Sequence, residues 1–556
     1  MTQSDPRWAG PSPSAISGLS NMPPSRSRGS RPRERTQRFA DRAVSRVNTS
    51  GWMEGLMAAT LRIALGAALA ATLLADVVEQ GPRDSAPSGL LAGMARGDIT
   101  PPVGIAQMNW GSQTHVRAEG IDPAGMKATA LVLSDGNQKF AMVDVDRIFS
   151  AGLEPAITVA AKRTGIPEAH IRIGVSHTHA GVMVSPAKGP PGLDLTPLVD
   201  MAERYRLSVI DKVAGLIAEA NGRLEPAHIH GGRGEGTINI NRRVRADGES
   251  PPAVGRNPAG FVDRELVVFR IDDAHGQAMA ILANFQCHGT VLAYENRFIS
   301  PDWIGMTRAT VEQAFPGALA LFFQGAAGNQ GPIEGFSGDL AVAHRLGRTL
   351  GHQVAAVAMQ IETVDRGPTF EGFVESTAFQ AKQHWRVRGP RDATLRFTSR
   401  IVDVPRRTYS GDEIASMRRR LERAQQRLRQ LPESATALER HQAGARVRRF
   451  ADLLAQWTQP VDPSPLQIEV QALRVGELAL VAMPGEPFAE IGVAVKRASP
   501  FEFTMFCGYS DGVGGDYVPT AAEYQYGGYE VERTPYNPGA AEIVVEAASA
   551  LLASLR

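Results

Sequence analysis

The chain has 556 residues, 43% hydrophobic and 21% charged, a composition typical of a folded globular protein with a large core. Its 59 Lys and Arg balance 58 Asp and Glu, which excludes a whole-molecule field that would attract nucleic acid. The two cysteines, Cys287 and Cys507, exclude a disulfide framework and a cysteine-built zinc module, and leave open one bridge between them.

The N-terminal part resembles a targeting region more than a folded one. Residues 1–52 are rich in Ser, Pro and Arg and predict a disordered basic extension. Within the following segment and linker, 53–91, the uncharged run 63–75 is shorter than the about 20 residues that span a bilayer, but suits the core of a secretory signal. A translation start at Met53 or Met57 would give a conventional short signal. We therefore expect export to the periplasm or outside the cell; a retained membrane anchor and a buried or amphipathic helix are the alternatives.

From residue 92 onward, short β-type runs alternate with helical stretches such as 201–219. This alternation predicts one large α/β domain over 92–556, with mixed sheets flanked by helices. The strand-like runs lie at 128–133, 140–146, 265–271, 279–287, 318–323 and 468–483.

One segment departs from this alternation. Over 411–459, Arg and Glu crowd around Leu at helical spacing, and Pro432 separates two halves. The pattern predicts an exposed helical hairpin inserted in the domain. Its basic excess allows contact with lipid headgroups at a membrane surface, and a solvated charged face is the commoner explanation.

The strongest local signal is the run from Ile171 to Val175 followed by Ser176-His177-Thr178-His179. On a strand, residues two apart point to the same face, so both imidazoles could address one point in space. Neutral imidazole is a good zinc ligand. The alternative is a pair of edge-strand histidines bonded to water or backbone.

Three further segments offer donor atoms. His288 follows the buried-type run 279–287, Glu486 follows Leu480 to Gly485, and Tyr517 lies in Asp516-Tyr517-Val518. Each has a simpler explanation: a satisfied core histidine, a solvated loop carboxylate and a packing tyrosine. Tyrosine is a rare zinc ligand because its phenol must lose a proton near neutral pH.

The order of these segments resembles the neutral ceramidase family. The residues that carry the resemblance are His177-Thr178-His179-Ala180-Gly181, Asn239-Ile240-Asn241-Arg242, His288-Gly289-Thr290, Gly485-Glu486, and Tyr517 with Glu523-Tyr524 and Tyr529-Glu530 beyond it. The runs 97–101 and 300–305 resemble the family's opening motif and the segment after its second zinc histidine. The likeness covers roughly 92–540.

The resemblance implies a zinc ion held by His177, His288, Glu486 and Tyr517. Their donor atoms should then converge, with metal–ligand distances of about 2.0–2.2 Å. It also implies that His179, Arg242 and Tyr529 line the site. Members hydrolyse the amide of N-acylsphingosine; zinc would activate water, His179 could move a proton and Arg242 could bind a carboxylate.

Two departures from the family pattern bear on mechanism. The family has a serine, assigned as catalytic, in a loop where this chain has Gly328-Asn329-Gln330-Gly331-Pro332, and Gly331 is the matching position. The Gly-rich turn 324–331 could still offer backbone NH groups to an oxyanion, or be a simple tight turn. The family's C-terminal immunoglobulin-like domain has no expected counterpart up to Arg556, so the native substrate stays open.

These observations favour a zinc-dependent hydrolase that cleaves a small-molecule or lipid amide. The competing hypotheses are a metal-binding relative without catalysis, motivated by Gly331, and an esterase on the same scaffold. No nucleic-acid or obligate protein partner is inferred.

Overall fold

The computed structural model describes residues 89–556 except 111–112, 114, 184–195, 246–250 and 461. The basic extension and the signal-like run 63–75 therefore lie outside the described residues. The described residues belong to one compact unit, Arg83–Arg556. Within this part of the chain, none of the helices combines the length and the apolar character needed to cross a bilayer.

The largest element is an eight-stranded mixed sheet in the order β12-β10-β9-β6-β1-β3-β4-β5. Most neighbours are antiparallel, but β4 pairs with β5, and β10 with β12, in parallel. The strands are β1 Leu91–Asp98, β3 Lys127–Ser134, β4 Lys139–Val145, β5 Ile171–Val175, β6 Glu225–Glu235, β9 Glu265–Asp273, β10 Ala278–Phe285 and β12 Leu319–Gln324. Both faces of this sheet are buried, which explains why several strands are apolar throughout rather than alternating.

A four-stranded sheet packs on one face of the first. Its order is β16-β17-β18-β20, with bounds Leu395–Val404, Leu466–Val475, Leu478–Ala482 and Phe503–Cys507. Leu131 and Leu133 face this second sheet, whereas Ala130 and Val132 face helices, as the two-residue period of a strand requires. The predicted single run 468–483 is wrong in one respect: Gly476, with φ 58°, turns the chain and makes β17 and β18 an antiparallel hairpin.

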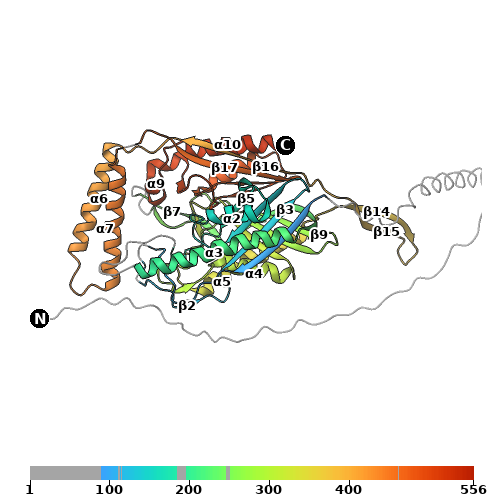
Figure 1. Cartoon of the computed structure of the whole chain (residues 1–556), viewed down its shortest axis with the longest axis horizontal. Helices are drawn as coiled ribbons and strands as arrows, with labels where there is room; N and C mark the ends of the chain where they lie inside the picture. Colours follow the sequence, from blue (N-terminus) through green and yellow to red (C-terminus); the bar gives the residue numbers. More distant parts are fainter. Residues whose placement is uncertain (1–88, 111–112, 114, 184–195, 246–250, 461) are drawn as a thin grey trace, which may run out of the picture. The chain divides into compact units, whose positions relative to one another are not determined.

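Helices cover the two outer faces and complete four layers, helix, sheet, sheet and helix. On the eight-stranded sheet lie α2 Glu154–Thr164, α3 Thr196–Gly222, α4 Trp303–Ala314 and α5 Leu340–Gln360. On the four-stranded sheet lie α8 Ala489–Ala498 and α10 Ala540–Ser554; Figure 1 shows α3 running across the first sheet and α10 beside β16 and β17. The predicted α/β class is thus confirmed.

Smaller elements decorate these layers. They are β2 Gly120–Ile121 with β11 Phe298–Ile299, β7 Asn239–Val244 between β8 Ala253–Asn257 and β13 Gln330–Pro332, β14 Asp365–Val374 with β15 Gln380–Gly389, and β19 Glu486–Pro487 with β21 Tyr517–Val518. Short helical turns are η1 Glu168–His170, η2 Ala521–Tyr526 and α9 Tyr529–Arg533.

The segment expected to be a helical insertion contains α6 Gly411–Arg429 and α7 Ala437–Trp457, which lie side by side in Figure 1. Each begins with a capping box, Ser410 with Glu413 and Thr436 with Glu439, which satisfies the free NH groups of the first turn. The pair has a small apolar cluster of its own around Met417, Leu453 and Trp457. This cluster is separate from the core between the sheets.

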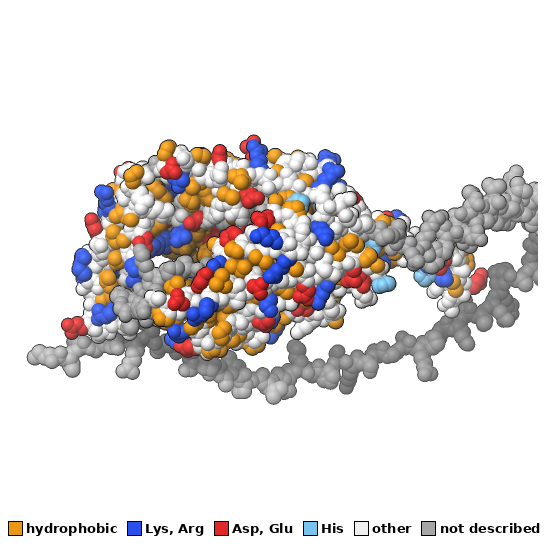
Figure 2. Space-filling view, viewed as in Figure 1, with side chains coloured by type: hydrophobic (Ala, Val, Ile, Leu, Met, Phe, Trp, Pro, Cys, Tyr) orange, Lys and Arg blue, Asp and Glu red, His pale blue; other side chains and the backbone are white. Residues whose placement is uncertain are grey.

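The surface charges of the domain are mixed in sign, and its two cysteines form no disulfide. On the face shown in Figure 2, acidic and basic side chains are interspersed, in keeping with the near-zero net charge. Cys287 and Cys507 are both buried and unpaired, so the bridge that the sequence left open does not form. Burial raises the pKa of the Cys507 thiol to about 11, which keeps it protonated and unreactive.

Candidate metal centre and active site

Two short parallel bridges bring the predicted donor segments together. An isolated bridge pairs Thr178 with Gly289, so the segment of His177 and His179 runs beside His288. The second bridge is β19 with β21, in which Glu486 lies directly opposite Tyr517. Each bridge therefore places candidate ligands from distant parts of the sequence next to each other.

The geometry behind the His-x-His pair differs from the expected strand. β5 ends at Val175, and His177 follows in the left-handed region with φ 60°. The two rings nevertheless meet, with centroids 4.8 Å apart and perpendicular planes, and their Nε2 atoms are 3.2 Å apart. The prediction that both imidazoles approach one point holds, but a strained loop rather than the strand period produces it.

The orientation of the buried histidines is fixed by backbone carbonyls. Nδ1 of His177 lies 2.6 Å from the oxygen of Ile148, and Nδ1 of His288 lies 2.7 Å from the oxygen of Ala327. A carbonyl only accepts, so each Nδ1 carries the proton in the neutral ring and each Nε2 presents a lone pair. This is the arrangement in which metal-binding histidines are held by their second nitrogen.

These lone pairs face a carboxylate. Nε2 of His288 is 3.0 Å and Nε2 of His177 is 3.5 Å from the same Oε2 of Glu486. Burial lowers the pKa of both imidazoles, that of His288 to about 3, so protonation does not relieve the repulsion. Ligand atoms of His177, His179 and His288 all lie within 4.8 Å of one another. A buried cluster of nitrogen and oxygen acceptors suits a divalent cation such as zinc.

Glu486 is matched to this role by its charge. Burial alone would raise the pKa of its carboxyl, but the permanent positive charge of Arg242 acts against burial, and the pKa lies below its ordinary value. The carboxylate is therefore ionised at neutral pH although its side chain is only 8% exposed. A carboxylate buried at this depth needs a cationic partner.

Tyr517 is tied to Arg242. The phenol oxygen accepts a hydrogen bond of 3.0 Å from Nη2 of Arg242, which favours the phenolate because it places positive charge beside that oxygen. Burial acts in the opposite direction and raises the pKa of Tyr517 well above its ordinary value. Metal ligation by this phenol would therefore require the ion itself to supply further positive charge.

Arg242 lies on β7 in a buried network. Its Nε donates to Glu530 over 2.9 Å, and Nη1 of Arg243 donates to the other oxygen of Glu530 over 2.6 Å. Glu530 is 1% exposed and compensates part of the charge of both guanidinium groups. The pair was visible in the sequence as Arg242-Arg243, but nothing there indicated that one carboxylate would bind both.

His179 lies beside the cluster and contacts Trp110, with ring centroids 4.9 Å apart. Nδ1 of His179 and Nε1 of Trp110 are both buried without a hydrogen-bond partner among the described residues. Burial, together with the neighbouring imidazoles of His177 and His288, lowers the pKa of His179 well below its ordinary value. Unpartnered polar atoms at a site are available to a ligand.

Tyr529 occupies the edge of the site. The centroid of its ring is 5.7 Å from that of Tyr517. The guanidinium of Arg449 lies over the Tyr529 ring, 4.5 Å from the ring centroid. Arg449 belongs to α7, so the insertion reaches the site. Arg449 and Tyr529 are far apart in the sequence, so no local pattern predicted their contact.

The loop that carries Gly331 orients His288. The carbonyls of Ala327 and Gln330 both lie within hydrogen-bond distance of Nδ1 of His288. The expected oxyanion role is wrong for three NH groups of this turn, those of Gly325, Gly328 and Gln330, because they donate to the carbonyls of Phe285, Pro487 and Ala327. A Cβ built on Gly331 would lie 3.4 Å from Cβ of Arg242, so there is room for a small side chain beside Arg242.

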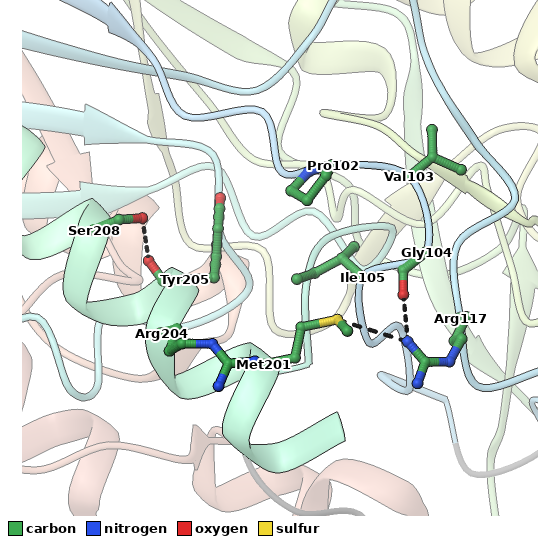
Figure 3. A pocket seen from close by; sticks show the side chains of 9 residues that line it. All are labelled: Pro102, Val103, Gly104, Ile105, Arg117, Met201, Arg204, Tyr205 and Ser208. Atoms are coloured by element: carbon green, nitrogen blue, oxygen red, sulfur yellow. Dashed lines mark hydrogen bonds between the residues drawn. The ribbon is translucent and has the colours of Figure 1, made fainter. Parts of the chain in front are cut away.

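A separate groove of about 500 Å³ lies between the N-terminal half of α3 and the loop that follows β1. Figure 3 shows its two arginines, Arg117 and Arg204, beside an apolar wall that includes Ile105 and Met201. None of its lining residues belongs to the predicted site. The groove is thus distinct from the histidine cluster.

Comparisons with known proteins agree with this architecture. Residues 90–383 match the family described as neutral/alkaline non-lysosomal ceramidase, N-terminal. A neutral ceramidase of Pseudomonas aeruginosa is 24% identical over 477 residues, which cover 80% of this chain and 69% of that protein. The crystal structure of neutral ceramidase from Pseudomonas aeruginosa has a TM-score of 0.57 at 19% identity, covering 84% of this chain and 74% of that one. A structure described as ceramidase complexed with C2 gives the same TM-score and identity, with 84% and 75% coverage.

At this identity the structural likeness establishes the fold alone, whereas the family match spans more than half of the 556 residues. The chain therefore belongs to the neutral/alkaline non-lysosomal ceramidase family.

Proposed function

We propose that this protein is a zinc-dependent amidohydrolase that cleaves an N-acyl amide, in particular an N-acyl sphingoid or related lipid amide. Membership of the ceramidase family supports the reaction class. The proposed metal ligands are His177, His288, Glu486 and Tyr517. When bound, the metal would polarise the amide carbonyl and lower the pKa of a water.

The observation that carries the proposal is the meeting of two Nε2 lone pairs with the Glu486 carboxylate. Backbone carbonyls fix both tautomers, and burial disfavours protonation of either ring. Acceptors held this close in a buried place repel one another, so a cation shared among them would stabilise the arrangement. The donor set also has the mixed nitrogen and oxygen character that zinc accepts.

The remaining residues have roles that follow from their positions. His179 is next to the cluster and its Nδ1 has no hydrogen-bond partner among the described residues, so it can accept a proton from water and pass it to the leaving amine. Arg242 faces Tyr517 and can donate to the carboxylate product, because Arg243 has a second carboxylate partner in Glu523 and does not depend on Glu530 alone. Tyr529 would help to shape the entrance.

The test is hydrolysis of a panel of N-acyl amides by the full-length protein, before and after chelation and after zinc is returned. We expect turnover that chelator abolishes and zinc restores, with one zinc per chain by elemental analysis. Turnover that chelation leaves unchanged would overturn the zinc-dependent mechanism.

Two other functions lead to different results in the same assay. A relative that has lost catalysis, suggested by Gly331, would bind zinc and cleave nothing. An esterase on this scaffold would cleave ester analogues of the same acyl chains and leave the amides intact. Matched ester and amide substrates therefore separate all three.

We also propose that the protein is exported. The support is the uncharged run 63–75 in the sequence, which has the length of a secretory signal core. Fractionation of cells expressing the full reading frame tests this proposal. A cytosolic product that retains this run would contradict it.

A further inference from the structure

The site contains a residue that the metal ligands and the proton-transfer role of His179 leave unexplained. Tyr509 lies after β20, and its ring is tilted against that of His177 with centroids 4.4 Å apart. The same ring meets that of His288 edge-on at 5.8 Å. Tyr509 thus packs against both buried imidazoles.

The hydroxyl of Tyr509 has no obvious structural purpose. The residue is 3% exposed, and its oxygen makes no hydrogen bond to any of the described residues. A buried hydroxyl without a partner is unfavourable, and phenylalanine would fill the same space without that cost. The carboxylate of Glu486 is a nearby acceptor that acts on this hydroxyl without the geometry of a hydrogen bond, and Arg242 acts on it as well. The hydroxyl therefore lies toward the centre of the site.

The backbone holds Tyr509 in a demanding conformation. Its φ of 52° is in the left-handed region, which is unfavourable for a bulky residue. Two hydrogen bonds retain it there: Val175 N donates to the oxygen of Tyr509 over 3.1 Å, and Tyr509 N donates to the oxygen of Gly485 over 2.9 Å. The same loop therefore ties Tyr509 to the ends of β5 and β18, beside His177 and Glu486. Strain that neighbours enforce in this way is typical of functional positions.

We propose that Tyr509 is a catalytic residue whose hydroxyl donates a hydrogen bond to the substrate carbonyl oxygen as that oxygen gains negative charge. The inference rests on the proposed amide hydrolysis. A donor that is already buried and oriented stabilises developing charge without reorganisation. The role is relevant here because three NH groups of the Gly-rich turn are engaged with protein carbonyls and Gly331 has no hydroxyl.

The test is Tyr509→Phe in the full-length, zinc-loaded protein, with Tyr205→Phe as control. Tyr205 donates its hydroxyl to the oxygen of Ile99 and lies outside the site. We expect Tyr509→Phe to lower kcat roughly 10²-fold, the effect of removing one such donor, with KM and zinc content unchanged and a melting temperature equal to or above wild type. Tyr205→Phe should show the reverse pattern: lower melting temperature and unchanged kcat.

A second measurement does not depend on turnover. An alkylphosphonate carries a tetrahedral anion, and its dissociation constant for the zinc-loaded protein should rise about tenfold in Tyr509→Phe, the result of losing one charge-assisted hydrogen bond, and stay constant in Tyr205→Phe. Unchanged kcat and phosphonate affinity would overturn the inference, and so would loss of zinc, because Tyr509 would then be a ligand. If wild type cleaves no amide, the proposed function fails, while the phosphonate comparison still decides whether Tyr509 donates to an oxyanion.

Discussion

The proposed metal-binding cluster and the edge of the site are held in place by different interactions. The cluster, defined by His177, His288 and Glu486, is buried, and backbone carbonyls at the ends of core strands orient its imidazoles. The edge, defined by Tyr529 and Glu532 of α9, is held by Arg420 and Arg449 of the insertion. Each arginine donates to one oxygen of Glu532 over 2.6 Å.

The interactions that hold the two regions should differ in their dependence on salt. Backbone hydrogen bonds inside a packed core are insensitive to salt, whereas ion pairs of arginines that are about a third exposed weaken to some extent as ionic strength rises. The insertion also has its own apolar cluster, so its attachment depends more on these charges than on the main core. We therefore expect the cluster to be insensitive to salt and the contacts at the edge to weaken as salt is added.

The largest effect should follow from removing a proposed ligand. His288→Ala deletes an imidazole that the Ala327 carbonyl orients, and we expect zinc affinity to fall by more than about 100-fold, a loss that even outer-shell partners can produce. Turnover should disappear with the metal. Elemental analysis and kinetics of one preparation measure both, and exposed His275→Ala is the control. Retention of stoichiometric zinc by His288→Ala would show that the ligand assignment is wrong.

Loss of His179 should separate chemistry from metal binding. His179→Gln removes the proposed proton carrier, and kcat should fall by roughly 10²- to 10⁴-fold. Zinc content should change little, because His177, His288 and Glu486 remain. The measurement is kcat together with bound zinc, at several pH values. A variant that loses zinc in proportion to its activity would instead identify His179 as a ligand.

The edge should give a smaller, salt-dependent effect. Glu532→Gln removes the charge that holds both arginines, so Arg449 should leave the Tyr529 ring and kcat/KM should fall about tenfold, equivalent to about 1.4 kcal/mol. Most of that change should lie in KM. Wild type should lose part of the same activity in 1 M NaCl, and the variant should not respond to salt. Arg418→Gln on exposed α6 is the matched control; equal salt responses in wild type and Glu532→Gln would disprove the edge role.

Part of the candidate site could be predicted from the sequence, because strand ends and short motifs leave a local pattern. The runs before His177 and His288 are apolar enough to indicate buried strands, and the family resemblance ordered the donor residues. The strand argument predicted that His177 and His179 approach each other, and they do. The reason is different, because His177 lies beyond the strand end with a positive φ and its ring packs against that of Tyr509.

Other features depend on contacts between distant residues and had no local signal. Tyr509 is part of no donor motif, and its unpartnered hydroxyl is apparent only once the surrounding atoms are placed. The Arg449 contact with Tyr529 joins an insertion to α9, and the shared Glu530 joins β7 to the same helix. Such pairings are set by tertiary packing, which a single sequence does not encode in its periodicity.

The smallest predicted effect tests whether burial makes a histidine acid-sensitive outside the proposed site. The histidine is His230, whose ring lies within 4.8 Å of the carboxylates of two exposed residues, Glu477 and Glu502. His230 on β6 is 9% exposed, and burial, with a contribution from Arg391, lowers its pKa to about 4. Because the folded-state pKa is below the ordinary value of about 6.5, the unfolded chain takes up the proton first on acidification. The stability that neutral His230 contributes is thus fully present above pH 6.5 and is lost as pH falls toward 4.

His230→Gln removes this titration, so the variant should lose less stability than wild type between pH 7 and pH 4. We expect a difference of about 1–2 kcal/mol after allowing for solvent screening, measured as the free energy of urea unfolding of chelator-treated protein. His275→Gln at an exposed turn should follow wild type. Parallel pH profiles for wild type and His230→Gln would contradict the prediction, because they would mean that the His230 ring is hydrated in the folded state. The acid sensitivity of the protein would then arise at the histidine cluster.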